Sequence, residues 1–252
     1  MKVYVVISQE VYVTTQDFTW GVLAINVNKS IYLPGETAYL QMGVVDEQGN
    51  TVCDAKLELR IENKESGKGA NLSTEDGTIE YSGECSGNSA TSKPDYFGYA
   101  KLPSDTGVYQ MELTATTANG SHTITDQFEV QESVPFDVER FGPSRIYPPA
   151  DYEVKFKIVP MEDFTGQIVE TVPAEFLIGD IPDSQFFVLD SPGKKQIIWE
   201  VDWEAGETYE LDYTFKAPDI SPYKWLLGPL EFYDSPSTSS GSPRFFETRR
   251  WQ

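Results

Sequence analysis

The sequence is poor in the residues on which most catalytic and metal-binding sites depend. Its 252 residues include one histidine, His122, and two cysteines, Cys53 and Cys85. A single histidine excludes most sites that need two or more imidazole ligands. Basic residues are also scarce, with 19 Lys and Arg against 40 Asp and Glu and a formal net charge of −21. Nucleic-acid phosphates and anionic membrane surfaces repel such a chain, so we expect no nucleic-acid partner.

Long apolar runs and helical periodicity are missing as well. No apolar run approaches the about 20 residues that a membrane-spanning helix needs, so we expect no membrane span in this chain. The apolar run at residues 3–7 is too short for a signal peptide. The chain is therefore either cytosolic or a piece of a longer secreted protein, and we favour the secreted piece. Its 39% hydrophobic and 13% aromatic residues are typical of a globular protein.

Alternation of apolar and polar residues with a period of two dominates the chain. It is regular over residues 56–62, 109–114, 152–158 and 209–215. Turn signals such as Pro34-Gly35 and Pro192-Gly193 separate these runs. This pattern predicts an all-β protein of two tandem immunoglobulin-like antiparallel β-sandwiches, at residues 21–131 and 134–252. Residues 1–20 are predicted to form an N-terminal strand segment that is either extra or exchanged with a neighbouring subunit.

The two cysteines suggest one disulfide. An even pair without metal-ligand spacing favours a Cys53–Cys85 bridge, although two buried free thiols are the alternative. The surrounding Gly83-Glu84-Cys85-Ser86-Gly87 is similar to a nucleophile elbow, but the residues that follow predict a loop where an elbow needs a helix. We assign no catalytic, cofactor-binding or metal-binding residues. Calcium remains an option at acidic turns such as that of Asp46, although the spacing of a dedicated calcium loop is absent.

The segment Asp105-Thr106-Gly107-Val108-Tyr109 resembles the tyrosine corner of immunoglobulin-like sandwiches. In that motif the tyrosine begins a strand and its hydroxyl bonds to a backbone group upstream. Antibody-type domains carry a cysteine two residues later, where this chain has Met111. The disulfide of antibody domains is therefore absent, and the cysteine pair must link a different place.

Longer stretches resemble modules of prokaryotic surface proteins. Residues 32–37, 45–52 and 54–55 are similar to bacterial immunoglobulin-like repeats and macroglobulin-type domains. Residues 166–176, 196–199 and 205–211 resemble the conserved-repeat domains of such proteins. Both resemblances imply spacer or scaffold roles at the cell surface. The thioester motif of some macroglobulins is missing, so we expect no covalent trapping chemistry.

We therefore expect a non-catalytic, extracellular structural module of a microbial cell-surface protein: a stalk, sheath or filament subunit. Its partners would be further copies of itself or neighbouring domains. The alternative is an adhesion or carbohydrate-binding module, with Tyr223, Trp225 and Tyr233 as ligand-facing aromatics. Trp199 is predicted to be a core residue. A hydrolase would need two facing carboxylates, and no local motif singles out such a pair.

Overall fold

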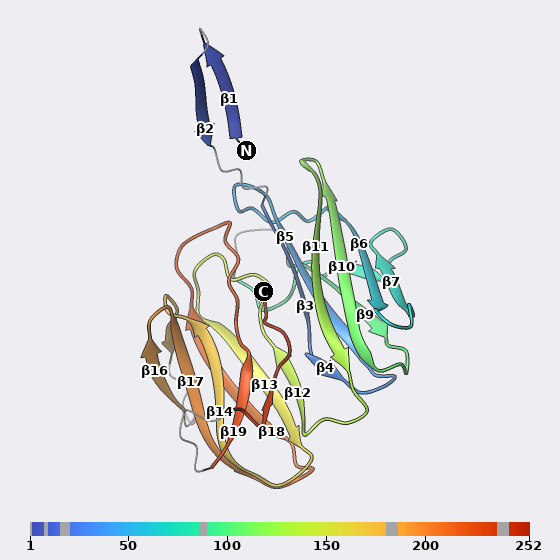
Figure 1. Cartoon of the computed structure of the whole chain (residues 1–252), viewed down its shortest axis with the longest axis vertical. Helices are drawn as coiled ribbons and strands as arrows, with labels where there is room; N and C mark the ends of the chain where they lie inside the picture. The colour runs from blue at the N-terminus through green and yellow to red at the C-terminus, as the bar shows by residue number, and fades with distance from the viewer. Residues whose placement is uncertain (1, 8–9, 16–20, 86–89, 180–185, 236–241) are drawn as a thin grey trace.

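The chain folds as β-sheets throughout the residues that the structure describes. The structure is a computed structural model, and it describes residues 2–7, 10–15, 21–85, 90–179, 186–235 and 242–252. These residues contain no helix, so the described part of the chain has no helix that could cross a membrane. Four sheets are arranged as two β-sandwiches, and a separate two-stranded hairpin precedes them (Figure 1).

The first sandwich contains a four-stranded and a five-stranded sheet. The four-stranded sheet has the order β3 (Val22–Val27), β5 (Thr37–Val45), β9 (Tyr96–Lys101) and β8 (Ile79–Tyr81). The five-stranded sheet has the order β4 (Ile31–Tyr32), β11 (Gly120–Val130), β10 (Gly107–Thr117), β6 (Lys56–Asn63) and β7 (Gly69–Ser73). The long hairpin of β10 and β11 is the centre of the second of these sheets.

The second sandwich also has four strands facing five. One sheet runs β12 (Phe136–Phe141), β13 (Tyr152–Pro160), β18 (Tyr209–Lys216) and β15 (Leu177–Gly179). The other runs β16 (Phe186–Ser191), β17 (Lys194–Trp203), β14 (Phe164–Pro173), β19 (Leu230–Asp234) and β20 (Phe245–Phe246). All pairings in these two sheets are antiparallel.

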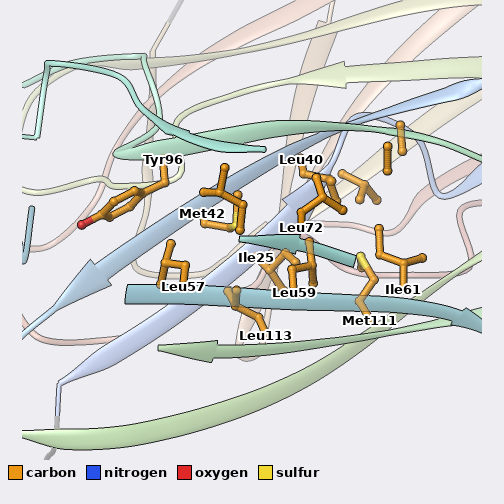
Figure 2. Packing of buried hydrophobic residues seen from close by; sticks show 14 of the residues in the cluster. Ile25, Leu40, Met42, Leu57, Leu59, Ile61, Leu72, Tyr96, Met111 and Leu113 are labelled. Carbon is orange, nitrogen blue, oxygen red and sulfur yellow. The ribbon is translucent and has the colours of Figure 1, made fainter. Parts of the chain in front are cut away.

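Period-two alternation places the core of the first sandwich. In β6, Leu57, Leu59 and Ile61 are buried while the residues between them are largely exposed. Figure 2 shows these side chains packed with Met111 and Leu113 of β10. Met111, at the position where antibody domains have cysteine, is therefore part of an apolar core. Burial of the Met111 side chain stabilises the folded sandwich by removing apolar surface from water.

A second apolar cluster begins at Val134 and extends to Phe245. It is rich in aromatic rings, among them Phe136, Phe164 and Phe232, whose centroids lie 4.2 to 6.0 Å apart. Ile31 of the first sandwich also packs into this cluster. The two cores thus separate between residues 130 and 134, and Ile31 and Leu33 of the first sandwich both pack against the second core.

One pairing departs from the predicted antiparallel arrangement. β4 lies parallel to β11, with Ile31 opposite Glu129 and Tyr32 opposite Val130. The chain passes from one sheet to the other between β3 and β4, and this crossing lets β4 run beside β11 in the same direction. The sequence pattern reports which face of a strand is apolar, but it does not report the direction of the neighbouring strand.

The N-terminal residues form a hairpin. β1 (Lys2–Ile7) and β2 (Glu10–Thr15) pair with each other in antiparallel register. Among the described strands, neither pairs with a strand of the sandwiches. The hairpin stands apart from both sandwiches at the top of Figure 1. Strand exchange by residues 1–20 stays a prediction.

Candidate functional site

The cysteines and the tyrosine of the first sandwich have structural roles. Cys53 and Cys85 are disulfide-bonded, with their Cα atoms 5.6 Å apart. Tyr109 is buried at the start of β10, and its hydroxyl donates to the carbonyl oxygen of Asp105 at 2.8 Å. The same arrangement occurs in the second sandwich, where the Tyr152 hydroxyl donates to the Pro148 carbonyl at 2.6 Å. The sequence reading missed this second corner, for which the Pro148-Pro149 turn before the β13 alternation is the available signal.

The predicted aromatic residues occupy different places. Trp199 is buried in the second core, with its ring centroid 6.1 Å from that of Phe156. Tyr223 and Trp225 lie together, with centroids 4.4 Å apart, and Trp225 also contacts Phe176. Tyr233 lies on β19, opposite Gln167 of β14. The structure therefore joins Tyr223 and Trp225 in one loop, while Tyr233 belongs to a sheet surface.

In the acidic turn considered for calcium, the Asp46 carboxylate is engaged by hydrogen bonds from within the turn. Asp46 Oδ1 accepts hydrogen bonds from the backbone N–H groups of Gln48 and Asn50, at 2.9 and 2.8 Å. Asp46 is partly desolvated, but these donors outweigh that effect and hold the pKa of Asp46 below its usual value. Over the described residues, no cluster of three or more His, Cys, Asp or Glu side chains could hold a metal ion.

A buried charge cluster lies inside the second sandwich. Arg140 of β12 forms a bidentate pair with Glu170 of β14, at 2.7 and 2.9 Å, and also contacts Glu247 at 2.6 Å. The three side chains are at most 1% exposed. Tyr213 donates a hydrogen bond to Glu170 at 3.3 Å. Burial raises the pKa of Glu170 above its usual value, although Arg140 lowers it.

The sequence contained a signal for this cluster that its reading missed. Phe136, Val138 and Arg140 are all buried, so Arg140 occupies an inward position of the β12 alternation. Glu170 likewise stands in the inward register of β14, between Ile168 and Val172. A charged residue at an inward strand position needs a buried partner, because an unpaired buried charge is very costly.

The segment that follows Glu247 connects the two sandwiches. Arg249 is buried, and its guanidinium donates to the Asp126 carboxylate of β11 and to the Ile25 carbonyl of β3. Gln252 exchanges hydrogen bonds with Asn26 through its backbone N–H and C=O, at 2.9 and 2.7 Å. Residues 247–252 therefore bond to the core of the second sandwich at one end and to the first sandwich at the other.

Two further buried cations cross the same junction. Lys29, 5% exposed, contacts Glu36 of its own sandwich at 2.8 Å and Asp137 of β12 at 2.7 Å. Burial lowers the pKa of Lys29, but these carboxylates outweigh it and the pKa lies above its usual value of 10.5. Arg145 of the second sandwich contacts Asp95 of the first at 3.3 Å. Removal of one partner from a buried ion pair is strongly destabilising, because it leaves the other charge buried without compensation.

A pocket opens beside this junction, between the first sandwich and two loops of the second. Its floor is the outer face of β3 and β5, around Ala24 and Gly43. Its walls include Ser144, Tyr223 and Trp225. Two of the three predicted ligand-facing aromatics therefore line a pocket at the domain interface, where ligand sites commonly occur. The cavity volume is about 90 Å³.

A second aromatic group lies on the outer face of the same sheet. The rings of Tyr39, Phe97 and Tyr99 have centroids 5.2 to 6.4 Å apart. Tyr99 is 61% exposed. We call these three residues the aromatic patch. The sequence reading did not select them, although Phe97 and Tyr99 occupy the outward positions of β9, where polar residues are expected.

Comparisons with known proteins give weak similarities. No protein-family model matches the chain, and no similar curated protein is found. Three solved structures are similar over much of this chain. One is a DUF4785 family protein from Legionella pneumophila, with 12% identity and a TM-score of 0.29. The others are Salmonella alpha-2-macroglobulin, with 18% identity and a TM-score of 0.30, and Escherichia coli alpha-2-macroglobulin activated by porcine elastase, with 10% identity and a TM-score of 0.33. They cover 85%, 93% and 98% of this chain, which spans only 53%, 15% and 24% of theirs. At these TM-scores the similarities carry no argument about family or function.

Proposed function

We propose that this chain is a non-catalytic structural module of a microbial cell-surface protein, in which two sandwiches form one rigid unit. The observation that carries the proposal is the junction, where three buried cations pair across the domains: Lys29 with Asp137, Arg145 with Asp95, and Arg249 with Asp126. If one sandwich slid against the other, these charges would lose their partners while still partly buried. Such a junction suits a spacer that holds its two ends in a fixed relation.

The disulfide supports an extracellular location. Disulfides persist mainly in oxidising compartments, and Cys53 and Cys85 are bonded. The net charge of −21 supports an exposed, soluble surface. Within this proposal, the β1–β2 hairpin is a candidate for assembly of a filament or sheath through strand addition.

The rigid unit is tested by small-angle X-ray scattering of the purified chain. The scattering curve should match a single arrangement of the two sandwiches. Arg249→Gln should broaden the distribution of interdomain distances, because it removes the cation between Asp126 and the carbonyl of Ile25. Arg244→Gln is the matched control, since Arg244 pairs with Asp234 and Glu162 inside the second sandwich. A wild-type curve that needs a broad ensemble would contradict the proposal.

Light scattering and negative-stain electron microscopy then separate a spacer from a polymer. Ordered fibres or rings would identify a self-assembling subunit. Monomers at high protein concentration would count against the filament and sheath versions and leave the stalk version.

The second candidate function is adhesion through carbohydrate, which the aromatic patch favours. Exposed aromatic rings can stack on the apolar faces of flat ligands, and Tyr99 offers such a ring. A glycan array should detect binding that Tyr99→Ala abolishes. Tyr81→Ala is the control, because Tyr81 is also exposed but packs near Tyr96, outside the patch. An array without hits would exclude this candidate.

A further inference from the structure

Three buried polar atoms that lack a partner among the described residues belong to residues that line the interdomain pocket. They are Asp95 Oδ2, Ser144 Oγ and Gln252 Oε1. Asp95 is completely buried, and its other carboxylate oxygen accepts from Arg145. Buried polar side-chain atoms in folded proteins nearly always have a hydrogen-bond partner. Three such atoms in one pocket therefore indicate a common partner that enters from outside the chain.

Two of the three atoms, Asp95 Oδ2 and Gln252 Oε1, can only accept a hydrogen bond. Gln252 Nε2 donates to Asp126 at 3.3 Å, which leaves the side-chain carbonyl oxygen of this pocket-lining residue as the polar atom without a partner. Asp95 Oδ2 is a carboxylate oxygen, and the Ser144 hydroxyl can accept or donate. Gly43 keeps the space between two of them open, because a Cβ there would lie 3.5 Å from Asp95 Oδ2 and 3.9 Å from Ser144 Oγ. The partner must therefore supply N–H or O–H donors.

The surrounding charges favour a neutral partner. Asp95 is already paired with Arg145, and Lys224 also lines the pocket. A cationic ligand would approach these two positive groups, whereas an anionic ligand would present acceptors to Asp95. The remaining walls are largely apolar, with Val22, Ala24 and Val45 on the sheet and Ile220 and Trp225 on the loop. An apolar body with a neutral donor group fits both features.

We propose that this pocket binds a small neutral ligand with an apolar body and a primary amide group, whose two N–H bonds donate to Asp95 Oδ2 and Gln252 Oε1 and whose carbonyl oxygen accepts from the Ser144 hydroxyl. The cavity of about 90 Å³ limits its size. One water-sized group needs about 10 to 15 Å³, so the pocket holds a ligand, or a terminal group of one, with roughly six non-hydrogen atoms. This site goes beyond the proposed structural role and does not depend on it.

Butyramide and butyrate test the proposal as a matched pair of probes. They share one carbon body, but butyramide donates N–H groups and is neutral, while butyrate only accepts and is negative. Titration into the full isotope-labelled chain, followed by NMR, should shift the resonances of Gly43 and Ser144 with butyramide, with a Kd in the millimolar range. Butyrate should bind about tenfold more weakly or not at all, since it would place a charge beside an unpaired acceptor.

Two variants locate the effect. Gly43→Ala places a methyl group between Asp95 and Ser144 without requiring an unusual backbone conformation, and should weaken butyramide about tenfold. Ser144→Ala removes the hydroxyl that donates to the ligand's carbonyl oxygen and should weaken butyramide binding several-fold. Ser133→Ala, an exposed position outside the pocket, is the control and should bind as the wild type does. Equal binding of the two probes, or no binding of either, would overturn the proposal and leave water as the partner of the three atoms.

Discussion

Substitution of Arg140 by methionine should strongly destabilise the second sandwich. Arg140 makes three charged contacts of 2.6 to 2.9 Å with Glu170 and Glu247, and all three side chains are at most 1% exposed. Without the guanidinium, two carboxylates remain buried side by side with no cation. Breaking a buried ion pair in this way costs about 3 to 5 kcal/mol, and we expect a loss in that range at pH 7.

Glu170→Gln is the matched comparison. It leaves Arg140 paired with Glu247, so one positive and one negative charge remain. The loss should be about 1 kcal/mol, the size of an ordinary hydrogen bond. Urea unfolding followed by tryptophan fluorescence measures both variants, because Trp199, Trp203, Trp225 and Trp251 all belong to the second sandwich. With a slope of about 2 kcal/mol per molar urea, Arg140→Met should lower the midpoint by roughly 2 M.

The pH dependence follows from the raised pKa of Glu170. Because the folded state holds this proton more tightly than the unfolded state, its contribution to stability falls as the pH rises from the unfolded pKa of a glutamate through the folded pKa. Glu170→Gln should lack this part of the slope, and Arg140→Met should recover stability when the pH is lowered from 7 to 5. A loss below about 1 kcal/mol for Arg140→Met, or equal losses for both variants, would refute the role of charge balance.

Three further predictions concern the disulfide, the two tyrosine corners and the junction. The Cys53→Ser, Cys85→Ser double variant should lose about 3 to 4 kcal/mol of unfolding free energy, since the bridge spans a sequence separation of 32; calorimetry should show the loss in the first sandwich only. Tyr109→Phe and Tyr152→Phe should each lower the free energy of unfolding by about 1 kcal/mol, because each removes one hydrogen bond from a hydroxyl to a carbonyl. Urea unfolding measures the change, and a value near zero at both sites would contradict a stabilising role for these corners. The raised pKa of Lys29 means that its stabilising contribution is complete below pH 10.5 and is lost as the pH rises through the folded pKa. The difference in melting temperature between the wild type and Lys29→Met should therefore be smaller at pH 12 than at pH 9.

Local pattern was sufficient to predict the strands in which apolar and polar residues alternate regularly. Alternation in residues 56–62 and 152–158 depends only on which side chains share a face, and β6 and β13 carry their buried residues in that alternation. This works because the two faces of a strand repeat every second residue, whatever the rest of the chain does. The all-β class could be predicted for the same reason, because the turn residues between alternating runs are also recognised from neighbouring residues alone.

Contacts between residues far apart in sequence were decided only by the tertiary structure. Arg140 and Glu247 are separated by 107 residues, and Arg249 and Asp126 by 123. The inward positions of Arg140 and Glu170 could have signalled a buried partner, but not which one, because the alternation of a strand fixes its faces and not its neighbours. The parallel pairing of β4 with β11 also depends on contacts between residues far apart in the sequence. The same is true of the acceptors around the interdomain pocket. Sequence determined the strands and their apolar faces. Tertiary packing determined the partners of the buried charges, both inside the second sandwich and across the junction, because it alone brings residues far apart in the sequence together. The pocket between the two sandwiches depends on the same packing.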